Sequence, residues 1–223
     1  MGIINKKLDI EIDNEELLPV TSKQSHSSSV ENIYDYGYGY NQAQMLNVPY
    51  LHNKGFQGSG VNIAIIDAGF QNLDIIPGFD SIRANGQILG TRDFVNPNSN
   101  IYNEHSHGMS VLSVIAANIP GQLTGVAPKA SFWLIRSEDG NSESLLEECN
   151  WVVAAEFADS VGVDIINSSL GYTTFDDPSQ DHVYAQLDGN TAIATRGANI
   201  AAQKGILVVN SAGNSGNELW RYL

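Results

Sequence analysis

The sequence predicts an α/β fold, a three-layer α/β/α sandwich built around a mostly parallel sheet. Strand-length apolar runs alternate with segments of helical periodicity from Val61 onward, which is typical of this class. The runs are apolar at consecutive positions, as expected for parallel strands that are buried on both faces. We expect four strands to lie parallel in one sheet, at residues 61–66, 131–136, 163–168 and 205–210.

Three helices are expected between these strands. The first begins near His107, and its inner face carries Val111, Leu112, Ile115 and Ala116. A capping-box pattern, Ser144 followed by Glu147, opens the second helix, in which Cys149 is predicted to be a small core residue. The third helix is the alanine-rich segment 191–204.

The rest of the chain is divided by composition. Residues 1–33 are polar and acidic, and we interpret them as a leader or the remnant of a pro-segment. Residues 34–223 are expected to form one domain, which opens with a helical pattern over 42–53. Turn-forming residues dominate between the first strand and the first long helix, so that this segment is predicted to be a loop through Asn100.

Charge and cysteine content exclude several function classes. The formal net charge is −14, from 11 basic and 25 acidic residues, so we expect neither a nucleic-acid nor a membrane partner. No apolar run reaches the length of a membrane-spanning helix. The single cysteine, Cys149, excludes an internal disulfide and a cysteine-based zinc site.

Three polar residues lie at the ends of expected elements or just after them, near the carboxyl ends of the parallel strands. Asp67 closes the first strand, His107 stands beside a glycine at a helix start, and Asn214 follows the last strand. Functional side chains gather beyond the carboxyl ends of parallel strands, which predicts that these three lie close together. Taken singly, each also fits a plain structural role as a turn or capping residue.

Asp67, His107 and Asn214, in this order, resemble the aspartate, histidine and oxyanion-hole asparagine of the subtilase family of serine proteases. The resemblance runs from about Tyr36 to the C-terminus. Other segments carry it too: Gly125–Ala130, similar to the family's Gly-Val-Ala-Pro-x-Ala, Ile166–Gly171, similar to the strand lining the substrate cleft, and Asp67–Phe70 with Ser137–Asp139, similar to one bacterial group.

The resemblance implies a serine endopeptidase that acts on polypeptides. By analogy with subtilisins, Asp67 would orient His107, His107 would carry the proton, and Asn214 would donate to the oxyanion. The same resemblance places an extended substrate along four residues: Ser169, Leu170, Gly171 and Gly213. It further implies a subtilisin-like α/β fold, a monomer when complete, and secretion, although the N-terminal sequence does not look like a signal peptide.

No metal or cofactor is expected from the sequence. His105 and His107 are two residues apart, but a zinc site would need a third ligand and there is no His-Glu-x-x-His motif. Calcium is frequent in the family, yet no acidic loop here has the spacing of calcium ligands.

The sequence departs from the family at two places. Met109 follows His107-Gly108 where the family has threonine, and no Gly-Thr-Ser segment, which carries the family's nucleophile, occurs among the 223 residues. We therefore predict a subtilase domain that is incomplete at its C-terminus and inactive as written. The alternative is a non-catalytic, subtilase-like protein that binds peptides.

Overall fold

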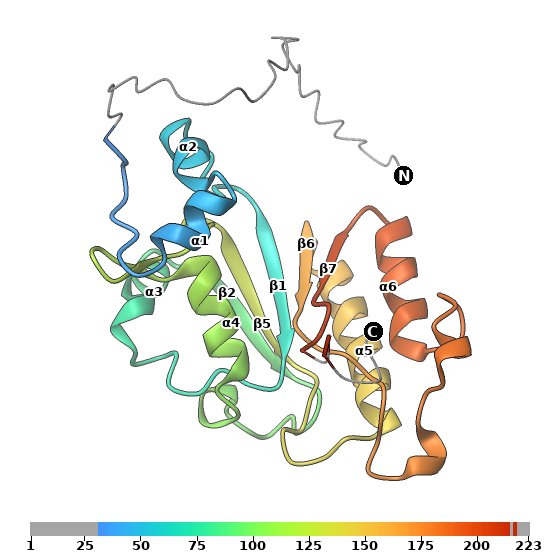
Figure 1. Cartoon of the computed structure of the whole chain (residues 1–223). Helices are drawn as coiled ribbons and strands as arrows, with labels where there is room; N and C mark the ends of the chain where they lie inside the picture. Colours follow the sequence, from blue (N-terminus) through green and yellow to red (C-terminus); the bar gives the residue numbers. More distant parts are fainter. Residues whose placement is uncertain (1–30, 215, 218–223) are drawn as a thin grey trace, which may run out of the picture. The chain divides into compact units, whose positions relative to one another are not determined.

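A computed structural model describes residues 31–214 and 216–217. Five strands form one sheet in the order β2-β5-β1-β6-β7, and every neighbouring pair in it is parallel, as predicted (Figure 1). Almost all of the leader predicted at residues 1–33 lies outside the described residues, so its boundary stays a prediction. The strands are β1 Asn62–Asp67, β2 Ile88–Asp93, β5 Ser131–Arg136, β6 Ile165–Ser168 and β7 Leu207–Asn210.

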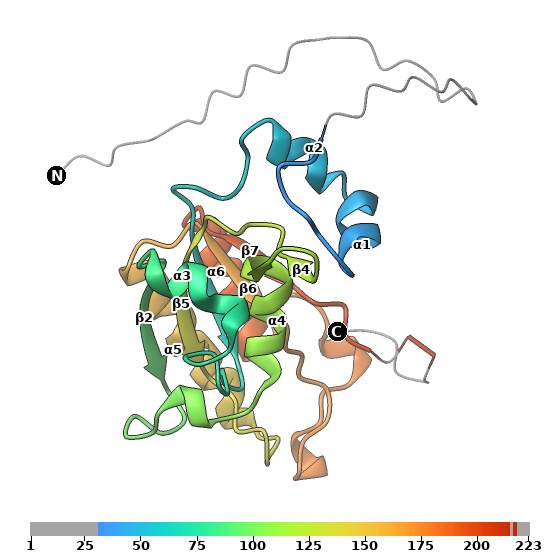
Figure 2. The ribbon, with the colours of Figure 1, turned by 90° about the vertical axis from the view of Figure 1, so that its left-hand side faces the viewer.

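Helices cover both faces of this sheet, which confirms the three-layer sandwich (Figures 1 and 2). One face packs against α3 (Asp80–Ala84) and α4 (His107–Ala116), the other against α5 (Leu145–Ser160) and α6 (Ile193–Gln203). The other α-helices and strands are α1 Tyr40–Met45, α2 Val48–Asn53, and the short antiparallel pair β3 Asn118–Ile119 and β4 Leu123–Thr124. Short 3₁₀ helices lie at Pro77–Phe79, Ile101–Asn103, Pro178–Gln180 and Tyr184–Gln186. No helix in the described part of the chain is both long and apolar enough to cross a membrane.

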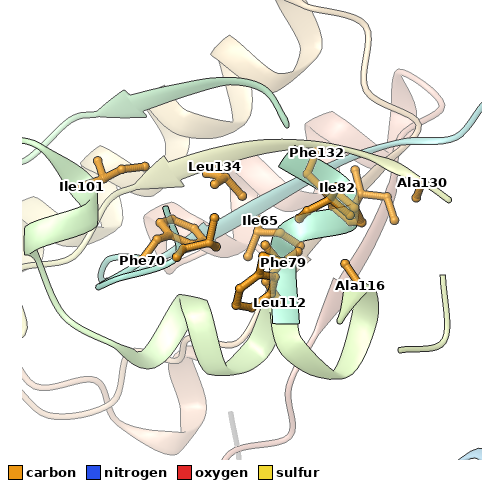
Figure 3. Close-up of a cluster of buried hydrophobic side chains, with 12 residues drawn as sticks. Ile65, Phe70, Phe79, Ile82, Ile101, Leu112, Ala116, Ala130, Phe132 and Leu134 are labelled. Atoms are coloured by element: carbon orange, nitrogen blue, oxygen red, sulfur yellow. The ribbon is translucent and has the colours of Figure 1, made fainter. Parts of the chain in front are cut away.

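Strand β1 lies at the centre of the sheet, and its side chains alternate between two cores. Ile65 packs in the cluster beneath α4, with Leu112, Phe132 and Leu134 around it (Figure 3). Ala64 and Ile66 face the opposite cluster, against α5 and α6. Because both faces are buried, β1 is fixed between two helical layers, and its carboxyl end is held firmly in place.

The segment predicted as a long loop contains the 3₁₀ helix Pro77–Phe79, α3 and β2. Strand β2 escaped prediction because its sequence, with Gly90, Arg92 and Asp93, has no continuous apolar run. The helical pattern over 42–53 is also two helices rather than one. The break comes at Asn47, which has a left-handed φ of 56° and precedes Pro49 in the first turn of α2.

The inner face of α5 differs from the predicted one. Cys149 is exposed, so its assignment to the core was wrong. The capping box of Ser144 and Glu147 is present, but the buried face includes two acidic residues beside its apolar ones. It consists of Glu147, Glu148, Trp151, Ala154, Ala155 and Ala158. The spacing of apolar residues could not reveal this face, because two of its residues are glutamates. Their carboxylates are buried because they accept hydrogen bonds from backbone N–H groups.

Candidate active site

Asp67 ends β1 and is buried. Its carboxylate oxygen Oδ1 accepts a hydrogen bond from the backbone N–H of Ala68 at 2.7 Å. The other oxygen, Oδ2, is buried and has no hydrogen-bond partner among the described residues. The carboxylate at the end of β1 is therefore shielded from solvent and has few hydrogen-bond donors around it.

His107 opens α4 and contacts this carboxylate. Its Nδ1 lies 2.7 Å from Asp67 Oδ1, the contact that the sequence predicted. An ionised carboxylate only accepts hydrogen bonds, so Nδ1 is the nitrogen that carries the proton. The neutral ring then presents a lone pair at Nε2. The His107 side chain is 45% exposed, and no hydrogen bond to Nε2 is present within the described residues. One ring nitrogen is therefore anchored and the other is available as a base.

Gly108 permits this approach of α4 to β1. A Cβ at this position would lie 2.6 Å from the Gly69 carbonyl oxygen and 2.8 Å from Asp67 Cβ, closer than real Cβ contacts come. Only glycine lets the first turn of the helix sit directly on the aspartate. The His-Gly pair in the sequence therefore marks a packing constraint as well as a chemical group.

Burial controls the electrostatics of the pair. It raises the pKa of Asp67 above its ordinary range, and the hydrogen bonds from His107 and from the Ala68 amide offset part of this increase. A desolvated carboxylate gains most from a positive partner in direct contact. The contact therefore holds the His107 ring in a fixed orientation, with Nδ1 on the carboxylate and Nε2 pointing away from it, as a general base requires.

His105 does not contact Asp67. Its Nδ1 accepts a hydrogen bond from the His107 backbone N–H at 3.1 Å, and its ring lies against Gly140, where a Cβ would come within 2.8 Å. Among described residues, the carboxylates of Glu138, Glu143 and Glu147 form the single group of potential metal ligands close enough to share an ion. Neither histidine belongs to that group.

Glu138 is a buried acid that the sequence analysis named only as part of the segment Ser137–Asp139, without a role in the site. It follows β5 at the same edge of the sheet as Asp67. Burial raises the pKa of Glu138 to about 7, the nearby Glu147 and Glu143 add to the increase, and a hydrogen bond from the Tyr172 hydroxyl opposes it. The signal that could have revealed it is the acidic pair Glu138-Asp139, directly after an apolar strand.

A pocket of about 520 Å³ lies at the carboxyl ends of β6 and β7. Of the predicted substrate-binding residues, Leu170 and Gly171 line it, whereas the half-buried Ser169 and the exposed Gly213 do not. Its lining is Glu148, Trp151, Ser168, Leu170, Gly171, Tyr172, Leu187, Ala192, Ala194, Thr195, Ala198, Val208, Asn210, Ser211 and Ala212. Most of these side chains are apolar, so the pocket suits an apolar group.

Asn214 lies two residues beyond the pocket-lining Ala212 and is exposed. The described residues show no hydrogen bond between Asn214 and either Asp67 or His107. The structure therefore brings together two of the three residues proposed from the sequence, and the place of Asn214 in the site stays a prediction.

Comparison with known proteins agrees with this geometry. The model of the subtilase family matches residues 58–222. The chain is 33% identical to subtilisin E of Bacillus subtilis (strain 168) over 184 residues, covering 81% of this chain and 40% of that protein. It is 28% identical to alkaline elastase YaB of Bacillus sp. (strain YaB) over 221 residues, covering 96% and 49%. The chain thus spans about half the length of these relatives or less.

A solved structure shares the fold. MycP1 from Mycobacterium smegmatis superposes with a TM-score of 0.57 at 18% identity, covering 86% of this chain and 49% of that one. At this level of identity the likeness concerns the arrangement of strands and helices alone.

Proposed function

Because the chain belongs to the subtilase family of serine proteases, we propose that it supplies the aspartate and the histidine of a serine endopeptidase site. The observation that carries this proposal is the contact between His107 Nδ1 and Asp67 Oδ1, which leaves the opposite ring nitrogen accessible. A base that is anchored on one side and free on the other is what activation of a serine hydroxyl needs.

The proposed reaction is acyl transfer. His107 Nε2 accepts the hydroxyl proton of a serine as that oxygen attacks the scissile carbonyl carbon, and it later gives the proton to the leaving amine. Asp67 keeps the proton on Nδ1 and stabilises the imidazolium. The side-chain amide of Asn214 donates a hydrogen bond to the oxyanion of the tetrahedral intermediate. No metal ion or cofactor enters this scheme.

The nucleophile is proposed to come from a segment that these 223 residues do not include. Two observations support this: the sequence has no Gly-Thr-Ser segment, and His107 Nε2 has no hydroxyl partner among the described residues. The chain as written is accordingly proposed to be inactive. The coarser assignment, a serine protease by family, does not depend on this point.

The proposed substrate is a polypeptide bound in extended form along Ser169–Gly171. Its apolar side chain would enter the pocket lined by Leu170 and Gly171, whose lining is mostly apolar. A net charge of −14 argues against nucleic acid as a partner. That the complete protein is a monomer acting outside the cell is a proposal that rests on the family alone.

Hydrolysis of a fluorescent casein tests the proposal. A chain extended through the downstream reading frame is expected to cleave it, and His107→Ala should lower kcat/KM at least ~10⁴-fold, the scale established for subtilisin triads. Val114→Ala, exposed on the same helix, is the control and should retain activity. An extended, folded chain that binds extended peptides without cleaving them would instead establish the peptide-binding alternative.

A further inference from the structure

Arg136 is a buried cation at the carboxyl ends of the parallel strands, where the active-site pair lies. It is the last residue of β5, lies opposite Asp67 in the parallel register, and is only 5% exposed. A guanidinium stays charged at any pH at which proteins fold, so its burial has to be compensated by carboxylates and carbonyl oxygens. The partners of Arg136 therefore indicate which parts of the chain its charge holds in place.

These partners come from four segments of the chain. The Nε–H donates to the carbonyl oxygens of Ala68 at 3.1 Å and of Glu138 at 3.0 Å. Nη1 lies 3.1 Å from Asp93 Oδ2, and Nη2 lies 3.4 Å from Glu104 Oε2 and 3.8 Å from Asp139 Oδ1. One side chain thus connects the loops that follow β1 and β5 with the end of β2 and with the loop that precedes α4.

Two of these contacts act on the catalytic residues most directly. Ala68 supplies the N–H that binds Asp67 Oδ1, and Arg136 restrains the same residue through its carbonyl oxygen. Glu104 is three residues before His107, in a segment that packs closely on Gly69. A Cβ added to Gly69 would lie 2.5 Å from the backbone nitrogen of His105. Arg136 therefore contacts both the Ala68 segment and the Glu104 segment close to the place where they pack together.

We propose that Arg136 is a positioning residue, which holds the Ala68 and Glu104 segments together so that Asp67 Oδ1 and His107 Nδ1 stay in contact. This inference rests on the proposed function, since it concerns the same pair of residues. The planar fork of arginine is essential to it, because a single ammonium group cannot reach a carbonyl and two carboxylates from different loops at once. Arg136 touches no reacting atom in this arrangement.

The test is NMR of the ¹⁵N-labelled 223-residue chain, which reads the contact without any need for activity. The readout is the low-field proton on His107 Nδ1, identified by its loss in Asp67→Asn. In Arg136→Lys the charge remains but the fork is lost, so we expect this proton to exchange with water at least about tenfold faster, the factor for one lost hydrogen bond to a charged group. Arg92→Lys, on the neighbouring strand β2, is the matched control and should leave the proton unchanged.

A second variant covers the case in which Arg136→Lys does not fold. Glu104→Gln keeps the buried arginine but replaces a partly exposed carboxylate, and it should also accelerate exchange of the His107 proton. If either variant keeps a native amide spectrum and an unchanged His107 resonance, the positioning role is refuted. Such a result would leave the proposed endopeptidase function intact, because casein hydrolysis tests that separately.

Discussion

At the scale of single residues, Asp67 and Asp93, which end neighbouring parts of the sheet at the carboxyl ends of β1 and β2, have opposite effects on stability. Burial raises the pKa of Asp67, whose Oδ2 has no partner among the described residues. Burial also acts on Asp93, but hydrogen bonds from Ser99, from the Asn96 amide and from Arg136 outweigh it and hold the pKa of Asp93 below its ordinary value. An ionised Asp67 therefore opposes folding, whereas an ionised Asp93 favours it.

The first prediction compares the two amides. At neutral pH, Asp67→Asn should raise the free energy of unfolding by about 1 kcal/mol, since it removes a desolvated charge. Asp93→Asn should lower it by roughly 2 kcal/mol or more, since the buried Arg136 loses a charged partner. Urea denaturation measures both. If Asp67→Asn destabilises the chain as much as Asp93→Asn does, the electrostatic account of Asp67 is wrong.

The second prediction concerns Glu138, whose pKa is raised by burial to about 7 from an ordinary value of 4.5. The folded chain then holds this proton at pH values at which the unfolded chain has lost it, so the contribution of Glu138 to stability falls as pH rises from 4.5 through 7. Glu138→Gln should remove this slope and stabilise the chain above pH 7 by roughly 2 kcal/mol.

Urea midpoints between pH 4 and 8.5 check this. Glu156→Gln, exposed on the outer side of α5, is the control and should follow the wild-type curve. The burial argument fails if Glu138→Gln also runs parallel to wild type across the whole range.

At the scale of elements, the site depends on how closely α4 approaches β1. The third prediction is that Gly108→Ala forces these two elements apart, because its Cβ would collide with Asp67 and with the Gly69 carbonyl oxygen. We expect a loss of about 1–3 kcal/mol in the free energy of unfolding, together with loss of the low-field His107 Nδ1 proton. Val114→Ala, exposed on the same helix, should keep that proton. A Gly108→Ala chain with wild-type stability and an intact resonance would contradict the proposed close packing.

The strands that could be predicted are those with a continuous apolar run in the sequence, including β7 at the edge of the sheet. β1, β5, β6 and β7 showed continuous apolar runs, whereas β2 contains Gly90, Arg92 and Asp93 and could not be distinguished from a loop. The contact of Asp67 with His107 was predictable because both lie at the carboxyl edge of a parallel sheet. Arg136 and Glu138 were not, because their burial depends on partners that the chain brings from distant loops.

At the scale of the whole molecule, β7 lies at one edge of the sheet as far as the described residues extend. Leu207 is 59% exposed and Val209 is 44% exposed on this strand. Apolar side chains beside an unpaired strand edge favour association between chains, while a net charge of −14 opposes it. Self-association should therefore increase as salt screens the charge.

The fourth prediction is that Leu207→Lys combined with Val209→Lys suppresses this association in high salt. Static light scattering across a salt series measures it. The matched control, Leu46→Lys with Leu51→Lys, changes the net charge equally at exposed positions near α1 and α2, and should scatter like wild type. Equal scattering of both double variants at high salt would show that the β7 edge is not the contact.

The central claim is that Asp67 and His107 form the acid–base pair of a serine endopeptidase whose nucleophile lies outside these 223 residues. A serine-reactive fluorophosphonate probe tests it most directly, applied to this chain and to one extended through the downstream reading frame. We predict that the extended chain is labelled, that His107→Ala abolishes the labelling, and that the 223-residue chain is not labelled. Labelling of the 223-residue chain that disappears in His107→Ala would reveal a working nucleophile within it and would contradict the account.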